Sequence, residues 1–426
     1  MQKIRLGVFF GGPSVEHEIA VISAAQAMAA ADPAKYELVP VYISKDGLWY
    51  TGPQLLDMKN YADLPKLLSR CQQVHMLADR GAHKLVAKGR GLFAKTQELP
   101  LDVVLPVMHG AHGEDGCLQG FLELLNIPYA GPGVLAAAVG MDKIMMKNVL
   151  AANQLPVLPG LWFTADEWFA EREAKLQQVE EQLGWPVIVK PANLGSSVGI
   201  SRADNPEELA AALDEAANFS GRLLLEPCLT DYREINCSVL GYGPKIRASV
   251  CEEPLTSNDF LTYQDKYLGG SGGAKGGKMG AKSGVKAGVG PKAGSQTGAG
   301  MSSAQRRVPA DLPSEQAAEI QSLASRAFTA LDGCGVARVD LLLDKTSGHS
   351  YINEVNTIPG SLSFYLWQAS GLDFTALIDE LVESALWRQR SKAKLTYSYD
   401  TNILAGLAAS ANGPVGTKAG AKSGLK

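Results

Sequence analysis

Apolar and helical segments alternate over the first part of the chain. Three apolar segments predict strands at residues 4–10, 37–44 and 102–110. Residues 15–31 have helical spacing, with carboxylates in the first turn, directly after a break at Gly11-Gly12-Pro13. Strands that alternate with helices indicate an open, largely parallel sheet whose binding edge lies at the carboxyl ends of its strands. We therefore predict a first, α/β domain at residues 1–140.

The following segment, residues 141–232, has the pattern of a small α+β domain. Its helical patterns enclose two apolar strands at residues 185–192 and 222–229. The first of these strands, WPVIVKPA, contains one lysine, Lys190, and the glycine-serine loop NLGSSVGIS follows it. This segment therefore places a cation and a flexible loop next to each other.

Residues 233–390 predict a second α+β domain that contains a β-hairpin. Two apolar segments, ARVDLLLD and YINEVNT, flank a short polar turn. Asp340, Glu354 and Asn356 lie inside these segments, where charge normally costs free energy. Glu354 and Asn356 are two residues apart, so they face the same side of their strand.

Two interpretations of this hairpin remain open from the pattern alone. The alternating polar residues are either the solvated face of a half-exposed hairpin or the ligands of a divalent cation, because Mg²⁺ prefers hard oxygen ligands. Arg338 shares a face with Asp340, which weakens the first interpretation. Pro359 and Gly360 end the second strand and expose backbone N–H groups beside the carboxylates, which suits a reaction that builds up negative charge on oxygen.

Lys190 and the loop after it point to phosphate. A buried ammonium group needs an anion, and the backbone N–H groups of residues 195–199 can surround phosphate oxygens. The loop is neither a Walker A sequence nor a G-x-G-x-x-G fingerprint. A P-loop ATPase and a nicotinamide dehydrogenase are therefore disfavoured.

Two further segments carry candidate chemistry at the edge of the first sheet. HGAHGEDG, residues 109–116, contains metal-ligand residue types, but its glycines separate them on a loop and no helical H-x-x-H face forms. A loop that reaches for a phosphate or a carboxylate is the favoured interpretation. Glu16 lies at the start of the first helix, either as an ordinary first-turn carboxylate or as the partner of a substrate ammonium.

Composition predicts a cytoplasmic protein without membrane or nucleic-acid partners. The chain has 426 residues, a formal net charge of −4 and six cysteines without a C-x-x-C pair, so a disulfide framework or a zinc site is disfavoured. No apolar run approaches the ~20 residues of a membrane span, and the first residues lack a cleavable signal pattern.

Two segments of low complexity stand apart from the rest. Residues 269–307 are rich in Gly, Ala, Ser and Lys, contain no acidic residue and predict a flexible insertion, either a lid or a tether. The end of the chain, TKAGAKSGLK, repeats the GAKSGVKAG phrase of that insertion. We therefore predict a C-terminal extension at residues 391–426 with a basic tail.

Seven motifs occur in an order that resembles the D-alanine–D-alanine ligases of the ATP-grasp superfamily. They are GGPSVEHE, HGAHGEDG, MDK, VIVKPANLGSSVG, DKYL, ARVDLLLD and INEVNTIPG. The resemblance implies an ATP-grasp fold in which two α+β domains enclose ATP with two Mg²⁺ or Mn²⁺ ions. It also implies a homodimer that phosphorylates one D-alanine carboxylate, which the amine of a second D-alanine then attacks, giving D-alanyl-D-alanine for peptidoglycan.

The resemblance also implies a role for individual residues. Residues matched to the family's ATP contacts are Lys143, Lys190, Ser196, Ser197, Glu226, Leu229, Glu234 and Lys266. Residues matched to its metal ligands are Asp340, Glu354 and Asn356. Residues matched to its catalytic and substrate contacts are Glu16, His109, Ser196, Tyr267, Arg338 and Gly360. Among these, Arg338 and the Gly360 N–H would stabilise an oxyanion, while Glu16, Ser196 and Tyr267 would form a hydrogen-bonded set.

One position departs from the family pattern. The family has a serine five residues after the glycine of its P-G pair, and this chain has Tyr365 there, with Ser363 two residues earlier. The lysine-tyrosine pair of DKYL favours an amine acceptor. Three alternatives remain: a D-alanine–D-lactate ligase, a D-alanine–D-serine ligase, or an inactive ATP-grasp protein that binds a partner.

Overall fold

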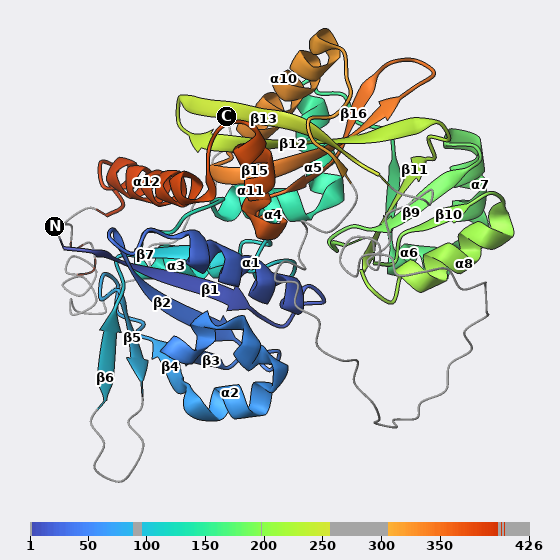
Figure 1. Ribbon diagram of the computed structural model, residues 1–426. Helices are drawn as coiled ribbons and strands as arrows, with labels where there is room; N and C mark the ends of the chain where they lie inside the picture. The colour runs from blue at the N-terminus through green and yellow to red at the C-terminus, as the bar shows by residue number, and fades with distance from the viewer. Residues whose placement is uncertain are drawn as a thin grey trace, which may run out of the picture. The chain divides into compact units, whose positions relative to one another are not determined.

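The computed structural model describes residues 2–87, 96–196, 198–255, 306–398, 402 and 404. Residues 1–388 form one compact unit and residues 389–426 form a second (Figure 1). Ser197, Lys266, Tyr267 and most of the glycine- and lysine-rich segment lie outside the described residues.

The first sheet has seven strands in the order β6-β5-β4-β3-β2-β1-β7. Its strands are β1 (Ile4–Gly11), β2 (Tyr36–Ile43), β3 (Trp49–Thr51), β4 (Gln72–Met76), β5 (Lys84–Ala87), β6 (Gln97–Pro100) and β7 (Val103–Val107). Two short 3₁₀ turns and a helix connect β3 to β4: η1 (Pro53–Leu56), η2 (Met58–Ala62) and α2 (Leu64–Arg70).

The expectation of a largely parallel first sheet needs a correction. Only β2, β1 and β7 pair in parallel, and each pairing from β2 outward to β6 is antiparallel. The connection from β2 to β3 spans only residues 44–48. Such a short connection allows an antiparallel return, whereas a parallel neighbour needs a crossover of about a dozen residues.

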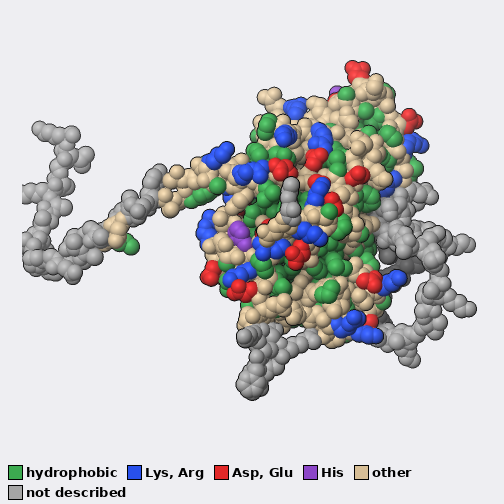
Figure 2. Space-filling view, turned by 60° about the vertical axis from the view of Figure 1, so that its left-hand side comes forward, with side chains coloured by type: hydrophobic (Ala, Val, Ile, Leu, Met, Phe, Trp, Pro, Cys, Tyr) green, Lys and Arg blue, Asp and Glu red, His purple; other side chains and the backbone are tan. Residues whose placement is uncertain are grey.

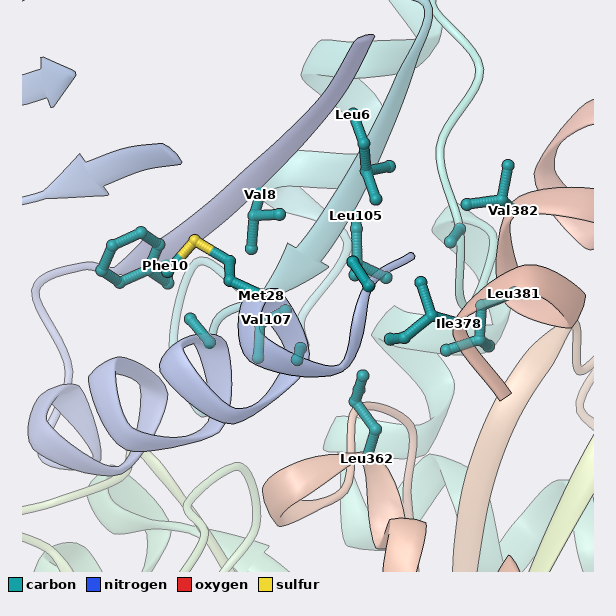
Figure 3. Close-up of a cluster of buried hydrophobic side chains, with 14 of the residues drawn as sticks. Leu6, Val8, Phe10, Met28, Leu105, Val107, Leu362, Ile378, Leu381 and Val382 are labelled. Carbon is teal, nitrogen blue, oxygen red and sulfur yellow. The ribbon is translucent and has the colours of Figure 1, made fainter. Parts of the chain in front are cut away.

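Helices cover both faces of the parallel strands. On one face, Leu6, Val8 and Phe10 of β1 pack against Met28 of α1 (His17–Ala30), as Figure 3 shows. On the other face, Phe9 packs against α3 (Cys117–Leu125), and α4 (Val134–Met141) follows in the chain. The sequence predicted that strands alternate with helices. In the structure, these helices bury both faces of the parallel strands.

The second sheet has four antiparallel strands in the order β10-β9-β11-β8. They are β8 (Leu161–Thr164), β9 (Val187–Pro191), β10 (Ser201–Ala203) and β11 (Arg222–Pro227). Three helices lie in the same stretch of chain: α6 (Ala165–Ala170), α7 (Arg172–Gln182) and α8 (Pro206–Ala216). Trp168 of α6, Val179 of α7 and Leu213 of α8 share one core with this sheet. On its opposite face, Leu224 packs with Ile144 of α5 (Lys143–Ala152).

The third sheet has five antiparallel strands in the order β14-β13-β12-β15-β16. They are β12 (Tyr232–Tyr242), β13 (Lys245–Pro254), β14 (Arg306–Arg307), β15 (Gly335–Asp344) and β16 (Ser350–Asn356). Helix α10 (Ser314–Ala330) packs on one face, where Phe328 meets Cys237 and Val339 in one core (Figure 1). The predicted hairpin of residues 337–357 is confirmed as β15 and β16.

The chain after the hairpin returns to the first sheet. It forms η4 (Gly360–Ser363), α11 (Phe364–Ala369) and α12 (Phe374–Lys392). Leu362 of η4 and Ile378 and Leu381 of α12 join Leu6 and Val8 in one apolar cluster (Figure 3). The first sheet and the end of the third segment therefore share a core, and the division into domains at residues 140, 232 and 390 stays a prediction.

Charged side chains are mixed over the surface. Figure 2 shows Lys and Arg interspersed with Asp and Glu over one face of the described residues, which matches the small net charge. Within the described ranges, no helix combines the length and apolar character that a membrane crossing requires.

Candidate functional site

Strand alternation builds a polar face on the third sheet. On β15, Val339 points into the core beneath α10, so Arg338 and Asp340 point to the opposite face. The antiparallel register pairs Arg338 with Asn356 and Asp340 with Glu354. The structure therefore brings together all four polar residues that the sequence singled out in the hairpin.

Arg338 and Asp340 form a bidentate ion pair. Arg338 Nε and Nη2 donate to the two carboxylate oxygens of Asp340 at 2.6 and 2.7 Å, and Asn356 Nδ2 donates to Oδ2 at 2.9 Å. The two charged residues are 8% and 2% exposed. Burial lowers the pKa of Arg338, but the Asp340 carboxylate more than offsets this, and the pKa is raised well above its usual value. The guanidinium therefore stays charged.

A shift in the β15–β16 register links the hairpin to the second sheet. Asp340 pairs with Glu354 and Leu341 pairs with Ile352, so Asn353 is the extra residue. Its Oδ1 accepts a hydrogen bond from Lys190 Nζ at 2.8 Å. This contact joins the predicted phosphate lysine to the strand that carries the predicted metal residues.

Lys190 belongs to a buried set of three charges. Its Nζ donates to Glu226 Oε2 at 2.6 Å, and Lys147 of α5 forms an ion pair with the other carboxylate oxygen. The side chains of Lys190, Glu226 and Lys147 are 9%, 1% and 7% exposed. Two ammonium groups share one carboxylate here, so the set has an excess of positive charge that suits an anion.

The pKa shifts of this set follow its burial. Burial lowers the pKa of Lys147, and Glu226 only partly opposes that effect. Burial also raises the pKa of Glu226, but Lys147 and Lys190 together outweigh it and lower the pKa. Sequence reasoning placed Glu226 among the ATP contacts and missed Lys147. The missed signal is a lysine four residues after Lys143, on the same face of α5.

Lys143 lies where the two sheets meet. It is the first residue of α5, its Nζ donates to the Leu194 carbonyl at 2.6 Å, and the Glu354 carboxylate lies 3.8 Å away. The Glu354 side chain is 23% exposed. Several predicted site residues line one cavity of about 40 Å³: Glu16, Lys143, Glu354 and Asn356, with Glu114 and Gly195.

Glu16 reaches the glycine-serine loop. It is 7% exposed directly before α1, and Ser196 Oγ donates a hydrogen bond to its carboxylate. A Cβ atom at Gly195 or at Gly110 would lie 2.8 or 2.9 Å from Glu16 Oε2. A side chain at either position would therefore displace the Glu16 carboxylate from its present place. The structure brings Glu16 and Ser196 together, while Tyr267 lies outside the described residues.

His109 is buried and bonded at both ring nitrogens. Nδ1 lies 2.8 Å from the Ile358 carbonyl, and Nε2 lies 2.9 Å from Ser23 Oγ. Because the carbonyl can only accept, Nδ1 carries the proton and Nε2 accepts from the serine. Burial lowers the pKa of His109. His109 would therefore affect a substrate through the backbone at Ile358, to which it is hydrogen-bonded.

Glu114 connects the same loop to the segment after β16. Its Oε2 accepts from Gly110 N–H at 2.9 Å and its Oε1 accepts from Ile358 N–H at 2.8 Å. Burial and the nearby Glu16 raise the pKa of Glu114 to about 8, although both N–H groups favour the ionised form. Sequence reasoning named Glu114 only in the disfavoured metal site, because its partner lies 244 positions away.

A left-handed turn follows Gly360. Ser361, Leu362 and Ser363 have φ angles of 52°, 53° and 51°, a conformation that costs about 1–2 kcal/mol for each residue with a side chain. Ser361 Oγ and Ser363 Oγ are buried and have no hydrogen-bond partner among the described residues. Strain and unpartnered hydroxyls together make this turn a candidate for contact with a ligand.

Tyr365 is engaged within the protein. Its hydroxyl donates to Glu252 Oε1 at 2.8 Å, and the guanidinium carbon of Arg306 lies 4.2 Å from the ring centroid. Burial, more than Glu252, raises the pKa of Tyr365. The hydroxyl that stands at the family's serine position is thus bound to a carboxylate of β13.

The other predicted residues lie around these contacts. Leu229 follows β11 and Glu234 lies on β12, and both are half-buried. Gly360 begins η4. Ser197 and Lys266 lie outside the described residues. Within the described part of the chain, no group of three or more His, Cys, Asp or Glu side chains has the arrangement of a metal site.

Comparison with known families matches almost the whole chain. The family model described as "D-ala D-ala ligase N-terminus" matches residues 5–132. The model described as "D-ala D-ala ligase C-terminus" matches residues 149–282 and 296–383. The stretch between these last two ranges falls inside the glycine- and lysine-rich segment, which supports its interpretation as an insertion relative to the family.

Curated relatives and solved structures agree with the family models. The D-alanine–D-alanine ligase of Heliobacterium modesticaldum is 37% identical over 92% of this chain and 98% of its own length. The one from Bacillus cytotoxicus is 36% identical over 93% of this chain and 100% of its own length. The D-alanine–D-alanine ligase structure from Coxiella burnetii matches with a TM-score of 0.72 at 28% identity, and the match covers 96% of this chain and 99% of that protein. The VanG D-Ala:D-Ser ligase of Enterococcus faecalis matches with a TM-score of 0.71 at 26% identity, and the match covers 90% of this chain and 100% of that protein.

Proposed function

Because the chain belongs to the D-alanine–D-alanine ligase family and has its ATP-grasp fold, we propose that it joins two D-alanine molecules in an ATP-dependent reaction. The product is D-alanyl-D-alanine for peptidoglycan, and the reaction passes through an acyl phosphate. One observation carries the proposal: Lys190 of the second sheet is bonded to Asn353 of the third, and beside this contact Lys143, Glu354 and Asn356 line one cavity with Glu16.

The cationic cluster fits the phosphates of ATP. Lys190 and Lys147 share Glu226, so an added anion would complete their charge balance, and Lys143 lies beside the same cavity. The N–H groups of the glycine-serine loop can surround phosphate oxygens. The loop after β11 that contains Leu229, together with Glu234 on β12, would hold the adenine and ribose, and Ser197 and Lys266 are proposed as further phosphate contacts.

The carboxylate cluster fits a hard divalent cation. Asp340, Glu354 and Asn356 offer carboxylate and amide oxygens, which are the ligands that Mg²⁺ and Mn²⁺ prefer, and Glu354 is partly exposed to solvent. We expect these residues to hold two ions with ATP. The ions would supply charge neutralisation to the transferred phosphoryl group.

The remaining residues would handle the two amino acids. Glu16, braced by Ser196, would hold the ammonium of the first D-alanine, and Tyr267 is proposed to complete that set. Arg338 and the Gly360 N–H would stabilise the oxyanion that forms when the second amine attacks the acyl phosphate. His109 would support this step by holding the Ile358 carbonyl.

The acceptor pocket is the part that departs from the family. Since the Tyr365 hydroxyl is bound to Glu252, we propose that Ser363, with its buried and unpartnered hydroxyl, supplies the contact to the second carboxylate. D-serine is the second candidate acceptor, because the VanG D-Ala:D-Ser ligase shares the fold at similar structural likeness. The higher identity to D-alanine–D-alanine ligases favours D-alanine.

Product formation tests the function directly. Purified protein with ATP and Mg²⁺ should release phosphate with D-alanine alone and form the dipeptide, as measured by chromatography and mass spectrometry. D-serine and D-lactate are tested as second acceptors at equal concentration. ATP turnover without any dipeptide or depsipeptide would contradict the proposal, as would a preference for D-lactate.

Oligomeric state and location are proposed from the same family membership. We expect a homodimer, which sedimentation velocity at micromolar concentration would detect, and a cytoplasmic location, which cell fractionation would detect. A monomer at all concentrations, or recovery with membranes, would contradict these expectations.

A further inference from the structure

We propose that Glu114 is a positioning residue for the acceptor step, acting from the first sheet on the segment that runs from Ile358 to the left-handed turn. The inference rests on the proposed ligase function and deepens it. It concerns how hydrogen bonds to the backbone hold the acceptor pocket and the oxyanion contact at Gly360 in place.

Both backbone groups of Ile358 are held from the first sheet. Its N–H donates to Glu114 Oε1 at 2.8 Å, and its carbonyl accepts from His109 Nδ1 at 2.8 Å. All three residues are buried. The β16 ladder ends at Asn356, so two side chains of a distant loop take over the role of a neighbouring strand here.

A third contact extends the same support to the turn. Ser361 N–H donates to Ser23 Oγ at 2.9 Å, and Ser23 in turn donates to His109 Nε2. Ser23 lies on α1 and is fully buried. The chain of bonds therefore runs from α1 through the histidine to both ends of the segment that encloses Gly360.

The two bonds of Glu114 differ in how much depends on them. Its Oε2 accepts from Gly110 N–H, but Gly110 is also held through its carbonyl, which accepts from the N–H groups of Gly113 and Glu114. The Ile358 N–H has the carboxylate as its partner. If the oxygen that accepts from Ile358 N–H were lost, the segment after β16 would thus be released, while the loop would keep its conformation.

The effect should fall on the second amino acid. The donor ammonium site, Glu16 with Ser196, is bonded independently of Ile358. The acceptor contacts proposed above, Gly360 and Ser363, both follow Ile358 within five residues. A shift of the segment would therefore misplace the acceptor and the oxyanion contact, and misplacement of about 1 Å can cost about 100-fold in rate.

Glu114→Gln tests this inference, with Asp115→Asn as the matched control. A glutamine can accept from only one of the two N–H groups and turns an N–H against the other. Asp115 also accepts two backbone N–H bonds, from His112 and Cys117, but both donors lie within three residues of it. The velocity is measured against D-alanine concentration and fitted with separate Michaelis constants for donor and acceptor.

We expect Glu114→Gln to raise the acceptor KM about 10- to 100-fold, with a donor KM and an ATP KM within about threefold of the parent. Asp115→Asn should leave the ratio of the two D-alanine constants unchanged. Ser23→Ala, which removes the acceptor of Ser361 N–H, should change the ratio in the same direction. Thermal unfolding of each variant shows whether stability falls equally in variant and control.

Two outcomes overturn the inference. One is an unchanged ratio of the two D-alanine constants in Glu114→Gln, whether or not both constants rise. The other is the same change of ratio in the Asp115→Asn control. An inactive parent protein would instead overturn the proposed function, so the two failures are distinguishable.

Discussion

The two charge clusters of the site differ in what each leaves unbalanced. At the second sheet, Lys190 of β9 and Lys147 of α5 share the single carboxylate of Glu226. On the third sheet, Arg338 is fully matched by Asp340, and Glu354 adds a further carboxylate on the same face. The first cluster has a cation in excess, and the second has one carboxylate more than the cations of its own sheet, with Lys143 of α5 3.8 Å from it.

This difference shows how the folded protein can hold charges that a ligand of opposite charge would balance. A buried charge without a partner is costly, so each cluster keeps most of its charge paired and leaves about one unit for a ligand. An anion completes the first cluster and a cation completes the second. ATP with a divalent cation has both signs, which supports the roles proposed for the two sheets.

The largest expected effect comes from unbalancing the matched pair. Asp340→Asn leaves the Arg338 guanidinium buried without its carboxylate, and breaking such a pair costs about 3–5 kcal/mol. The free energy of unfolding from urea titration measures this. Asp102→Asn is the control, because Asp102 makes the same bidentate pair with Arg5 but is 36% exposed and should lose no more than about 1 kcal/mol. Equal losses in both variants would show that burial does not set the difference.

A second change removes the anion that the third sheet holds in excess. Glu354→Gln should lower turnover roughly 100-fold or more, because a charged metal ligand is lost. The fold should persist, because the Glu354 side chain is partly exposed and Lys143, 3.8 Å away, keeps its hydrogen bond to the Leu194 carbonyl. Steady-state phosphate release at several Mg²⁺ concentrations measures the effect. Near-normal turnover at ordinary Mg²⁺ would remove Glu354 from the metal site.

The third change removes the excess cation of the second sheet. Lys147→Met keeps the apolar volume and leaves Lys190 paired with Glu226, so the KM for ATP should rise about tenfold. Stability should hold or increase at neutral pH. The pKa of Lys147 in the folded protein lies below that of the free side chain. The buried ammonium therefore destabilises the fold at a pH below both pKa values. Lys175→Met is the control on an outlying helix of the same segment, and an equal rise there would argue against a specific role.

The smallest expected effect is a pH dependence of the exposed pair. The Arg5 guanidinium lowers the pKa of Asp102. A lowered folded pKa means that the stabilisation exists above the unfolded pKa, near 3.8, and is lost as the pH falls through the folded value. The difference in unfolding free energy between the parent and Asp102→Asn should therefore shrink below about pH 4, by no more than about 1 kcal/mol. A difference that grows on acidification would contradict this sign.

Strand periodicity was sufficient to predict the hairpin face. Arg338, Asp340, Glu354 and Asn356 could be placed on one side because side chains alternate along strands, and the register confirms it. The extra residue Asn353 was not predicted, although the buried Ile352 and Val355 lie three positions apart where a regular strand would have two. Its contact with Lys190 is what connects the two sheets.

The residues that sequence reasoning missed act across long separations. Lys147 and Ser23 lie on helices and look like ordinary helical residues, and Glu114 lies in a loop with no local pattern for its role. Each becomes informative only through a distant partner, such as Ser361 at 338 positions from Ser23. Local spacing describes a residue's own element, whereas these roles depend on which elements pack together.

The strands at residues 49–100 were missed for a different reason. They are short, and β3 has only three residues, so neither period could be established from so few positions. Among the described strands of the first sheet, only the parallel strands β1, β2 and β7 have long apolar runs, and only these three were predicted.

Leu362 ties the conformation of the turn to a part of the protein far from any ligand. The three left-handed residues would relax if nothing retained them, and the burial of Leu362 among Leu6, Ile378 and Leu381 supplies about 2–3 kcal/mol against that relaxation (Figure 3). Substitutions on α12 that loosen this packing would consequently reshape the active-site loop without altering a single group that faces it. Variants with a new acceptor preference can therefore arise in the hydrophobic core, and a search confined to the pocket lining would overlook them.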